Sequence, residues 1–375
     1  MNLTHFAAHY KVFVLAPFLE TDDENLKYYY DFTQSIKEYE RVFKKLRIEW
    51  EWSPVTLKKF EATINSIVEK SQKKQPLFFN LCDGDEVNEC AGISVIRFLE
   101  EKKIIYTGAN DYFFDVTTSK IPMKKLFDEK NIPTAAWFVI NDRLTDFGVT
   151  DDGKKSPKSV SLSSEDFPLI LKPAVSGGSM GISTKSVVHN FTELKEQFEV
   201  LKKGYHSWNL LVDGAFAEKF IAGREFTTMI VGNCTNRKKA IVYKPVERVF
   251  HKSLSKNEQF LSFDRLWEFY DNEKEIEDAY LYQYETPEKT LIKKIKKISW
   301  EAYASVGGTG YGRVDLRIDE NTGKIYVLEV NAQCGISEDE DFTSIGAILR
   351  LSKHTYAGLV WSIIQTALNY ELINL

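Results

Sequence analysis

The sequence predicts an α/β protein whose C-terminal half is α+β. Strand-like and helix-like patterns alternate through the first third of the chain, which is typical of a parallel sheet with helices on both faces. In the last third, two apolar strand patterns flank a turn-forming segment from Asp319 to Gly323, which predicts an antiparallel hairpin. These observations place a parallel-sheet domain before an α+β region.

The composition is that of a large globular protein. The chain has 375 residues, 43% of them hydrophobic and 27% charged, which suggests two or three domains. A net charge of -5 with interspersed Lys and Asp/Glu residues argues against nucleic-acid binding. The four cysteines form no C-x-x-C pair, so a reducing compartment fits best. No membrane span or signal peptide is evident, and we expect a cytoplasmic protein.

The first third of the chain contains the expected parallel sheet. We expect strands at 11–16, 47–55, 76–84 and 105–108, and helices at 23–46, 56–74 and 90–104. In open sheets of this kind, ligands bind beyond the carboxyl ends of the strands, where Asn80, Asp83 and Gly84 lie. An ordinary turn is the alternative interpretation of these three residues, and both stay open.

The rest of the chain mixes strands, loops and helices. We expect helices at 117–131, 191–204, 290–307 and 347–373, strands at 132–140 and within 167–190 and 209–233, a surface loop at 141–165, and a charged excursion or lid at 251–288. Thr118 or Ser119 is the expected N-cap of the first of these helices, and Gly307 and Gly308 end the third.

The second strand of the hairpin ends in two polar residues on one face. Glu329 and Asn331 are two positions apart, so their side chains point the same way. Pairing across the turn can bring Asp315 near Glu329, with Arg313 on the same side. Two carboxylates and an amide oxygen favour a divalent cation such as Mg²⁺. For Glu329 and Asn331 alone, a strand fraying into a polar loop is the alternative.

Three further segments suggest a nucleotide site. Lys172 precedes a glycine-rich loop, Gly177, Gly178, Ser179, Met180 and Gly181, whose backbone N–H groups can bind phosphate oxygens. The stretch Glu218, Lys219, Phe220 and Ile221 can pair with an adenine edge, and Glu225 can accept from ribose hydroxyls. Lys120 and Lys124 share one helix face. The alternatives are a flexible hairpin tip, a charged hairpin and a solvated basic face.

Together these segments resemble the ATP-grasp superfamily, in its D-alanine–D-alanine ligase-like branch. The motifs that carry the resemblance, over roughly residues 78–335, are "IYTGAN", "SKIPMK", "NIPTAAW", "LILKPAVSGGSMGIS", "AEKFIAGREF", "GYGRVDLRI" and "YVLEVN". Several such motifs in the family's order and approximate spacing are specific, whereas any one of them alone is weak. The resemblance implies three domains, at 1–114, 115–215 and 216–375, with nucleotide bound between the last two.

The resemblance also implies roles for individual residues. Lys120 and Lys172 would contact the nucleotide phosphates, under the flexible loop Gly177–Gly181. Glu218, Lys219, Phe220 and Ile221 would form the adenine-binding hinge, with Glu225 as the ribose contact and Leu328 as a further nucleotide contact. Asp315, Glu329 and Asn331 would bind two Mg²⁺ ions, for which Mn²⁺ can substitute. Arg313 would stabilise the acylphosphate and tetrahedral intermediate, and the backbone of Gly335 would help form an oxyanion site.

The implied activity is an ATP-dependent carboxylate–amine ligation on an amino acid or peptide-like substrate. A carboxylate attacks the γ-phosphate of ATP, and an amine then displaces phosphate from the acylphosphate. Attack by a hydroxyl or thiol, modification of a peptide side-chain carboxylate, and a nucleotide-binding pseudoenzyme remain alternatives. The implied partners are small carboxylic acids and amines, with a homodimer left open because the family often dimerises through its N-terminal domain.

The chain departs from true D-alanine–D-alanine ligases in its substrate segments. The first strand lacks their glycines, and Glu20 is only a distant candidate for their amine-binding glutamate. After Asn331 the chain carries Glu338, Asp339, Glu340 and Asp341 in place of small hydroxyl residues. An acidic run would repel a carboxylate and favour an amine, whereas a solvated acidic loop is the alternative. The cell-wall dipeptide is therefore not the expected product.

Overall fold

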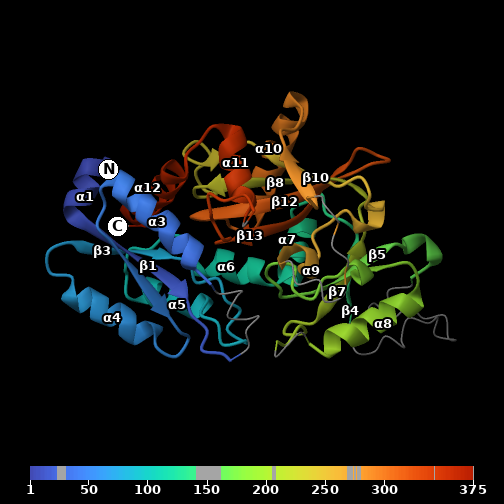
Figure 1. Ribbon diagram of the computed structural model, residues 1–375, viewed down its shortest axis with the longest axis horizontal. Helices are drawn as coiled ribbons and strands as arrows, with labels where there is room; N and C mark the ends of the chain where they lie inside the picture. The colour runs from blue at the N-terminus through green and yellow to red at the C-terminus, as the bar shows by residue number, and fades with distance from the viewer. Residues whose placement is uncertain are drawn as a thin grey trace.

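Three β-sheets organise the molecule. The computed structural model describes residues 1–22, 31–140, 162–204, 208–267, 273, 276, 280–341 and 343–374. The start of the expected first helix, most of the expected loop at 141–165 and part of the excursion at 251–288 lie outside these residues. Figure 1 shows an N-terminal unit at one end, the largest sheet in the middle and a smaller sheet at the other end.

The N-terminal unit is the parallel sheet that the alternating pattern predicts. Its strand order is β2-β1-β3, and β1 pairs in parallel with both neighbours. The elements are α1 (Leu3–His9), β1 (Tyr10–Pro17), α3 (Thr33–Leu46), β2 (Trp50–Val55), α4 (Phe60–Lys70), β3 (Gln75–Asn80) and α5 (Ile93–Glu101). The expected fourth strand is reduced to an isolated bridge between Phe78 and Tyr106, because the chain turns away at Gly108, which has a φ of 105°.

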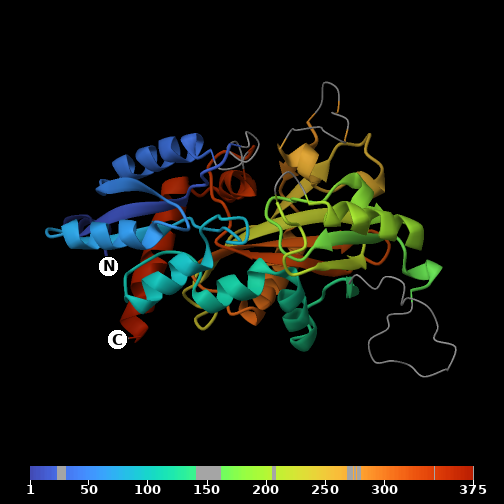
Figure 2. The ribbon, with the colours of Figure 1, turned by 90° about the horizontal axis from the view of Figure 1, so that it is seen from below.

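Alternation along these strands fills two separate cores. Val12 and Val14 belong to the core beneath α3, whereas Phe13 and Leu15 belong to the core beneath α4 and α5. Because successive strand residues point to opposite faces, the continuous apolar run of β1 needs helices on both sides. The same two-sided cover is visible in Figure 2.

The smaller sheet is antiparallel, with order β4-β7-β5-β6. It follows two helices along the chain, and its elements are α6 (Asp111–Thr118), α7 (Lys120–Glu129), β4 (Trp137–Ile140), β5 (Leu169–Pro173), β6 (Val187–Val188), α8 (Phe191–Lys202) and β7 (Ala215–Lys219). Helix α8 covers one face through Leu194, Phe198 and Leu201. The short helix α6, whose N-cap is Asn110, does not appear among the expected elements.

The largest sheet has the order β11-β10-β8-β12-β13, with β9 beside β8. Its elements are β8 (Gly223–Val231), β9 (Ile241–Val242), β10 (Val246–Phe250), α9 (Phe263–Trp267), β11 (Tyr282–Glu285), α10 (Lys289–Ser305), β12 (Tyr311–Asp319) and β13 (Ile325–Ala332), and the 3-10 turns η2 (Ser164–Asp166), η3 (Thr184–Ser186) and η4 (Lys256–Glu258) lie in the connections. The predicted hairpin is β12 and β13, paired antiparallel. Helix α10 ends where predicted, with Gly307 at a φ of 72°.

Strands β7 and β8 follow one another in the chain but belong to different sheets. The alternative of an ordinary charged hairpin over this stretch is therefore wrong. The turn between them, which contains Phe220 and Ile221, lies where the chain passes from the smaller sheet to the largest one. Strand β7 also carries the smaller sheet beyond residue 215, the expected domain boundary, to Lys219.

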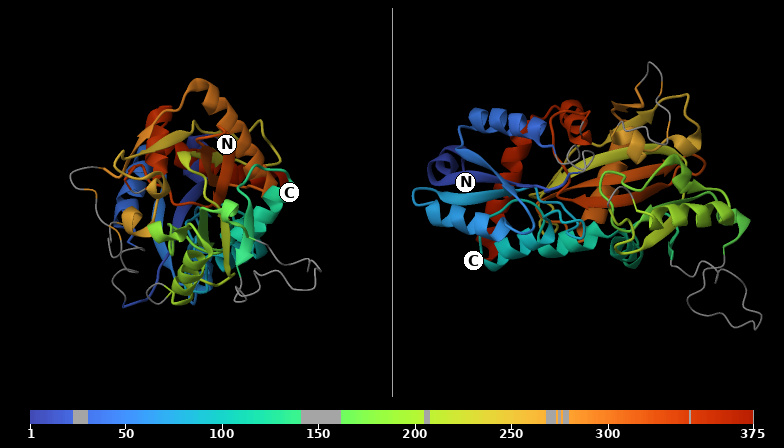
Figure 3. Two further views of the ribbon diagram at one scale, coloured as in Figure 1. Left: turned by 90° about the vertical axis from the view of Figure 1, so that its right-hand side faces the viewer. Right: turned by 60° about the horizontal axis from the view of Figure 1, so that its bottom comes forward.

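The last two helices, α11 (Ser344–Ser352) and α12 (Tyr356–Asn374), return to the N-terminal unit. Their apolar side chains share a core with β1, β3 and α3, and Figure 3 shows α12 beside the N-terminal elements. The single helix expected over 347–373 is broken at Lys353, whose φ of 58° ends α11 in a left-handed cap. No helix among the described residues is long and apolar enough to cross a membrane.

Candidate functional site

One face of the largest sheet carries Asp315, Glu329 and Asn331, the side chains expected to bind metal, which we call the metal-type cluster. Strands β8, β12 and β13 lie side by side, and the register places Asp315 opposite both Thr227 and Glu329. Arg313 lies opposite Asn331 in the same way. Because residues two apart share a face, all five side chains project on one side of the sheet. The other face packs on α10 through residues such as Val314 and Leu316.

A β-bulge keeps the two carboxylates opposite one another. Asp315 pairs with Glu329, but the next residue, Leu316, pairs with Val327, so Leu328 is the extra residue. A bulge bends the strand and re-aims the side chains that follow it. Leu328, expected as a nucleotide contact, is thus placed at the bulge beside Glu329.

The cluster is linked by hydrogen bonds in which Asp315 is the central acceptor. Thr227 Oγ1 donates to it at 2.6 Å, and the Arg313 guanidinium at 2.9–3.1 Å. Asn331 Nδ2 donates to Asp315 Oδ2 and to Glu329 Oε1, both at 3.1 Å. The amide therefore lies between two carboxylates, in the place where a cation would relieve their repulsion.

Lys120, the first residue of α7, also approaches this cluster. Its Nζ lies 3.6 Å from Glu329 Oε2 and donates to the Ser176 carbonyl at 3.0 Å. Burial alone would raise the pKa of Glu329. The positive charges of Lys120, Lys172 and Arg313 outweigh burial, so the pKa of Glu329 lies below its usual value. This carboxylate is ionised at neutral pH and available to a cation.

Glu218 forms a second charged centre with two lysines. Its Oε1 accepts from Lys172 Nζ at 2.7 Å and its Oε2 from Lys124 Nζ at 2.5 Å. The side chains of Glu218 and Lys124 are each only 1% exposed. The alternative of a solvated basic face for Lys120 and Lys124 is therefore wrong, since both are buried. Lys124 also donates to Thr134 Oγ1, at 2.6 Å.

The segment after Glu218 offers backbone groups as well as side chains. Lys219 directs its ammonium to the Phe167 carbonyl, at 2.7 Å, away from the carboxylates. Phe220 is buried, and its N–H donates to the Pro168 carbonyl at 3.1 Å. Within the described part of the chain, the N–H of Ile221 has no protein acceptor, whereas its carbonyl accepts from Arg317 at 2.7 Å. Ile221 thus leaves one backbone donor for a ligand.

The glycine-rich loop folds back on itself. Met180 N–H donates to the Gly177 carbonyl at 3.0 Å, and the Met180 side chain is buried in the core of the smaller sheet. Gly178, Ser179 and Gly181 all have a positive φ, a conformation in which glycine is favoured and serine is strained. The loop was expected to lie over phosphates. Its root is fixed beside Lys120, whose N–H donates to the Ala174 carbonyl at 2.8 Å.

Two other expected residues lie outside the cluster of Asp315, Glu329 and Asn331. Glu225 is buried and accepts from Arg248 and from Arg317, the latter at 3.2 Å. Gly335 is exposed, three residues beyond the end of β13, and the nearest atom to a Cβ built there is Thr343 Cγ2 at 3.9 Å. Gly335 therefore offers open backbone, as an oxyanion site requires.

The donor set fits a hard cation. Carboxylate and amide oxygens suit Mg²⁺, which keeps waters and substrate oxygens in its shell and needs few protein ligands. No group of three or more His, Cys, Asp or Glu that could hold a metal occurs among the residues that the structure describes. A site of Asp315, Glu329 and the Asn331 amide has only two carboxylates, so it agrees with this absence and with the ligand preference of Mg²⁺. All four cysteines are free.

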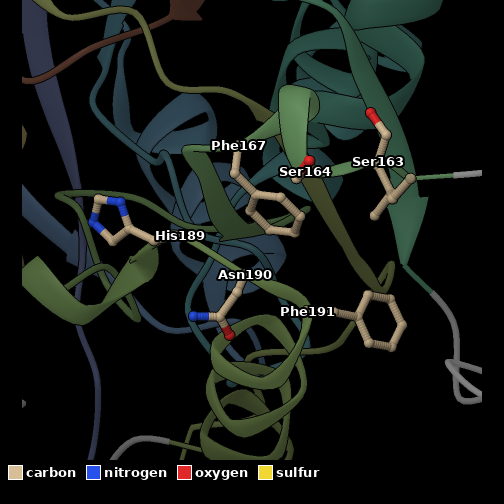
Figure 4. Close-up of a pocket in the computed structure, with 7 residues that line it drawn as sticks. Ser163, Ser164, Phe167, His189, Asn190 and Phe191 are labelled. Carbon is tan, nitrogen blue, oxygen red and sulfur yellow. The ribbon is translucent and has the colours of Figure 1, made fainter.

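The molecule also has a hollow of about 310 Å³ beside the smaller sheet. Figure 4 shows Ser163, Ser164 and Phe167 on one side of it and His189, Asn190 and Phe191 at the start of α8. None of the residues expected to bind nucleotide or metal lines this hollow. The charged face of the largest sheet therefore remains the candidate site.

Sequence patterns missed the partner of Lys124 and two further residues. Lys124 shares a helix face with Lys120, but only the fold shows that it faces a carboxylate 94 positions away. Arg317 continues the alternation of Arg313 and Asp315 along β12, and that period of two is the signal that could have found it. Arg248 lies on β10, a strand that the sequence patterns did not predict.

The chain is similar to known proteins in both sequence and structure. Residues 126–365 match the family model described as D-ala D-ala ligase C-terminus. A D-alanine–D-alanine ligase of Nitrosococcus oceani is 26% identical over 243 residues, covering 64% of this chain and 62% of the relative. One of Acinetobacter baylyi is 27% identical over 242 residues, covering 64% of each. The chain thus spans less than two thirds of the length of these relatives.

Solved structures resemble the whole chain. The D-alanine–D-alanine ligase of Bacillus anthracis in complex with ATP superposes with a TM-score of 0.62 at 18% identity, covering 97% of this chain and 99% of that one. This likeness shows that the fold is that of ATP-grasp D-alanine–D-alanine ligases. The family model covers well over half of the residues, and the chain belongs to the D-ala D-ala ligase C-terminal family.

Proposed function

We propose that this protein is an ATP- and Mg²⁺-dependent carboxylate–amine ligase that forms a peptide or amide bond through an acylphosphate. One observation carries the proposal: Asp315, Glu329 and Asn331 share a sheet face with Arg313, and Lys120 approaches the same carboxylates. A protein that only binds nucleotide has no need of this set. The relatives named D-alanine–D-alanine ligase and the ATP complex of the Bacillus anthracis protein support it.

The residues of this chain would orient the substrates and neutralise their charges, because phosphoryl transfer needs little covalent help from the protein. Lys120 and Lys172 are placed to neutralise phosphate oxygens. Asp315, Glu329 and Asn331 would hold Mg²⁺, which supplies further neutralisation of the phosphates when bound. Arg313, kept protonated beside Asp315, would stabilise charge that develops on the reacting acyl group.

The hinge and its neighbours would hold the nucleoside. The free N–H of Ile221 would donate to the base, Phe220 would pack near it, and Glu225 would accept from the ribose. Small carboxylic acids and amines would be the substrates, in a cytoplasmic enzyme of three domains. The cell-wall dipeptide is not the product that we propose, because the segments that would hold it differ.

A substrate screen tests this proposal. Mixtures of amino acids and peptides would be incubated with Mg²⁺ and ATP, phosphate release measured, and products identified by mass spectrometry. We expect turnover with a carboxylate and an amine together. Turnover only with a hydroxyl or thiol would replace the amide by an ester or thioester, and tight ATP binding without turnover on any acid would refute the ligase.

Glu329→Gln tests the metal assignment. We expect phosphate release to fall by at least about a hundredfold while circular dichroism is unchanged, because a neutral amide oxygen lacks the negative charge of the carboxylate and binds a divalent cation more weakly. Glu320→Gln, the same exchange at an exposed Glu in the hairpin turn, serves as the control. Full activity of Glu329→Gln would contradict the assignment.

A further inference from the structure

A row of three charged side chains crosses the largest sheet next to the metal-type cluster. Arg248 on β10 lies opposite Glu225 on β8, and Glu225 lies opposite Arg317 on β12. All three share the face of Asp315, because Arg317 follows it by two residues. The row therefore runs parallel to the Thr227–Asp315–Glu329 row, about 7 Å away along the strands.

Arg317 joins three segments that are far apart in sequence. Its Nε donates to Glu225 at 3.2 Å, its Nη1 to the Ile221 carbonyl at 2.7 Å, and its Nη2 to the Gln259 carbonyl. The guanidinium also lies over the Phe220 ring, 5.2 Å from its centre. Since the side chain is only 3% exposed, these contacts fix its position. A single group thus holds both the hinge and Glu225.

Of the hinge and Glu225, Arg248 holds only Glu225. It donates from Nη1 to Glu225 and from Nη2 to the Tyr284 hydroxyl at 3.2 Å, and it lies over the rings of Tyr282 and Tyr284. Its contacts do not include Ile221 among the residues that the structure describes. Each Glu225 oxygen accepts from one arginine and therefore keeps a second acceptor site for a ligand hydroxyl.

We infer that Arg317 and Arg248 are positioning residues that aim Glu225 at the ribose hydroxyls of the nucleotide, and that Arg317 alone also sets the hinge that reads the base. The inference rests on the proposed function, since it assumes a nucleoside at this site. A purely structural ion-pair row would affect stability but would leave the discrimination between nucleotides unchanged. Discrimination is therefore the quantity to measure.

The experiment compares the binding of ADP, 2′-deoxy-ADP, 3′-deoxy-ADP and GDP by titration calorimetry with Mg²⁺. The wild type is expected to prefer ADP to at least one deoxy analogue by about tenfold or more, the worth of a hydrogen bond to a charged group. In Arg248→Met this preference should fall to less than about threefold, while the preference for ADP over GDP is retained. In Arg317→Met both preferences should fall.

The matched control is Arg224→Met. Arg224 precedes Glu225 on β8, points to the opposite face and pairs with Glu247 and Glu288, so both preferences should stay at the wild-type values. Should Arg317→Met fail to fold, Arg317→Lys and Arg248→Met carry the test. Unchanged preferences in folded variants would overturn this inference alone. A wild type that binds no nucleotide would overturn the proposed function and the inference with it.

Discussion

Glu218→Gln is the substitution whose effect follows most directly from the structure. The carboxylate is 1% exposed and lies within 2.7 Å of two ammonium groups. Burial alone would raise the pKa of Glu218, but Lys124 and Lys172 lower it to about 2, from 4.5. Each unit of pKa difference is worth about 1.4 kcal/mol, so the ionised carboxylate stabilises the folded state by about 3 kcal/mol. This stabilisation is an upper value, since burial lowers the pKa of Lys124 and so opposes it.

The sign of the pH dependence follows from the lowered pKa. The stabilisation is fully present above pH 4.5 and is lost as pH falls toward 2, with about 2 kcal/mol lost between about pH 5 and about pH 3. Glutamine cannot titrate and leaves Lys124 buried without a charged partner, so at neutral pH we expect a loss of about 3 kcal/mol or more. The deficit of the variant should therefore shrink on acidification.

Urea unfolding without nucleotide, followed by tryptophan fluorescence over this pH range, measures the deficit. Glu199→Gln is the control, because Glu199 is 62% exposed and pairs with Lys202 on the surface of α8. Its deficit should stay within about 0.5 kcal/mol at every pH. A deficit of Glu218→Gln that is constant from pH 5 to pH 3 would refute the argument that the two lysines hold this carboxylate ionised.

Two further substitutions test the framework that holds the site. Gly310→Ala should lower the free energy of unfolding by at least about 2 kcal/mol in the same urea assay, because Gly310 has a φ of 64° and a Cβ would lie 1.9 Å from the Gly108 carbonyl oxygen. Its control is Gly323→Ala, with a φ of 67° and no atom within 4 Å of the new Cβ, which should lower the free energy of unfolding by only about 1 kcal/mol. Equal losses in the two variants would contradict the steric part of the argument. Glu38→Ala should lower the free energy of unfolding by about 2 kcal/mol, because buried Glu38 accepts from Ser337 Oγ at 2.6 Å and from the N–H of Glu338. Its control is Glu40→Ala, at an exposed position of the same helix, and a loss in Glu38→Ala no larger than that in Glu40→Ala would show that the hydrogen bonds of Glu38 contribute nothing to stability.

The metal-type face was predictable because it depends on local rules. The period of two along a strand fixes which of Arg313, Asp315, Glu329 and Asn331 share a face, and the short turn fixes the pairing of the two strands. The bulge at Leu328 was not predictable, although it is what keeps Asp315 opposite Glu329. Local periodicity carries no information about where an extra residue is accommodated.

The charged groups around the hinge could not be predicted in the same way. Glu218 meets Lys124 and Lys172 only because β7 pairs with β5 and lies against α7, and these elements are 46 to 94 residues apart. A lysine on an amphipathic helix is usually solvated, whereas the tertiary fold buries Lys124. The row of Arg248, Glu225 and Arg317 likewise requires the order of three strands, which no single segment specifies.

The acidic run after the site has a different meaning in the structure than in the sequence. Glu338 pairs with Arg41 on α3, and Glu340 accepts from Arg350 on α11 at 2.9 and 3.1 Å. These carboxylates are neither a bare amine-binding patch nor simply solvated, since arginines on both sides neutralise them. Glu338 instead links the segment after β13 to the N-terminal unit, beside the contact of Ser337 with Glu38. Any attraction of a substrate amine must therefore come from Asp339, Asp341 or another carboxylate.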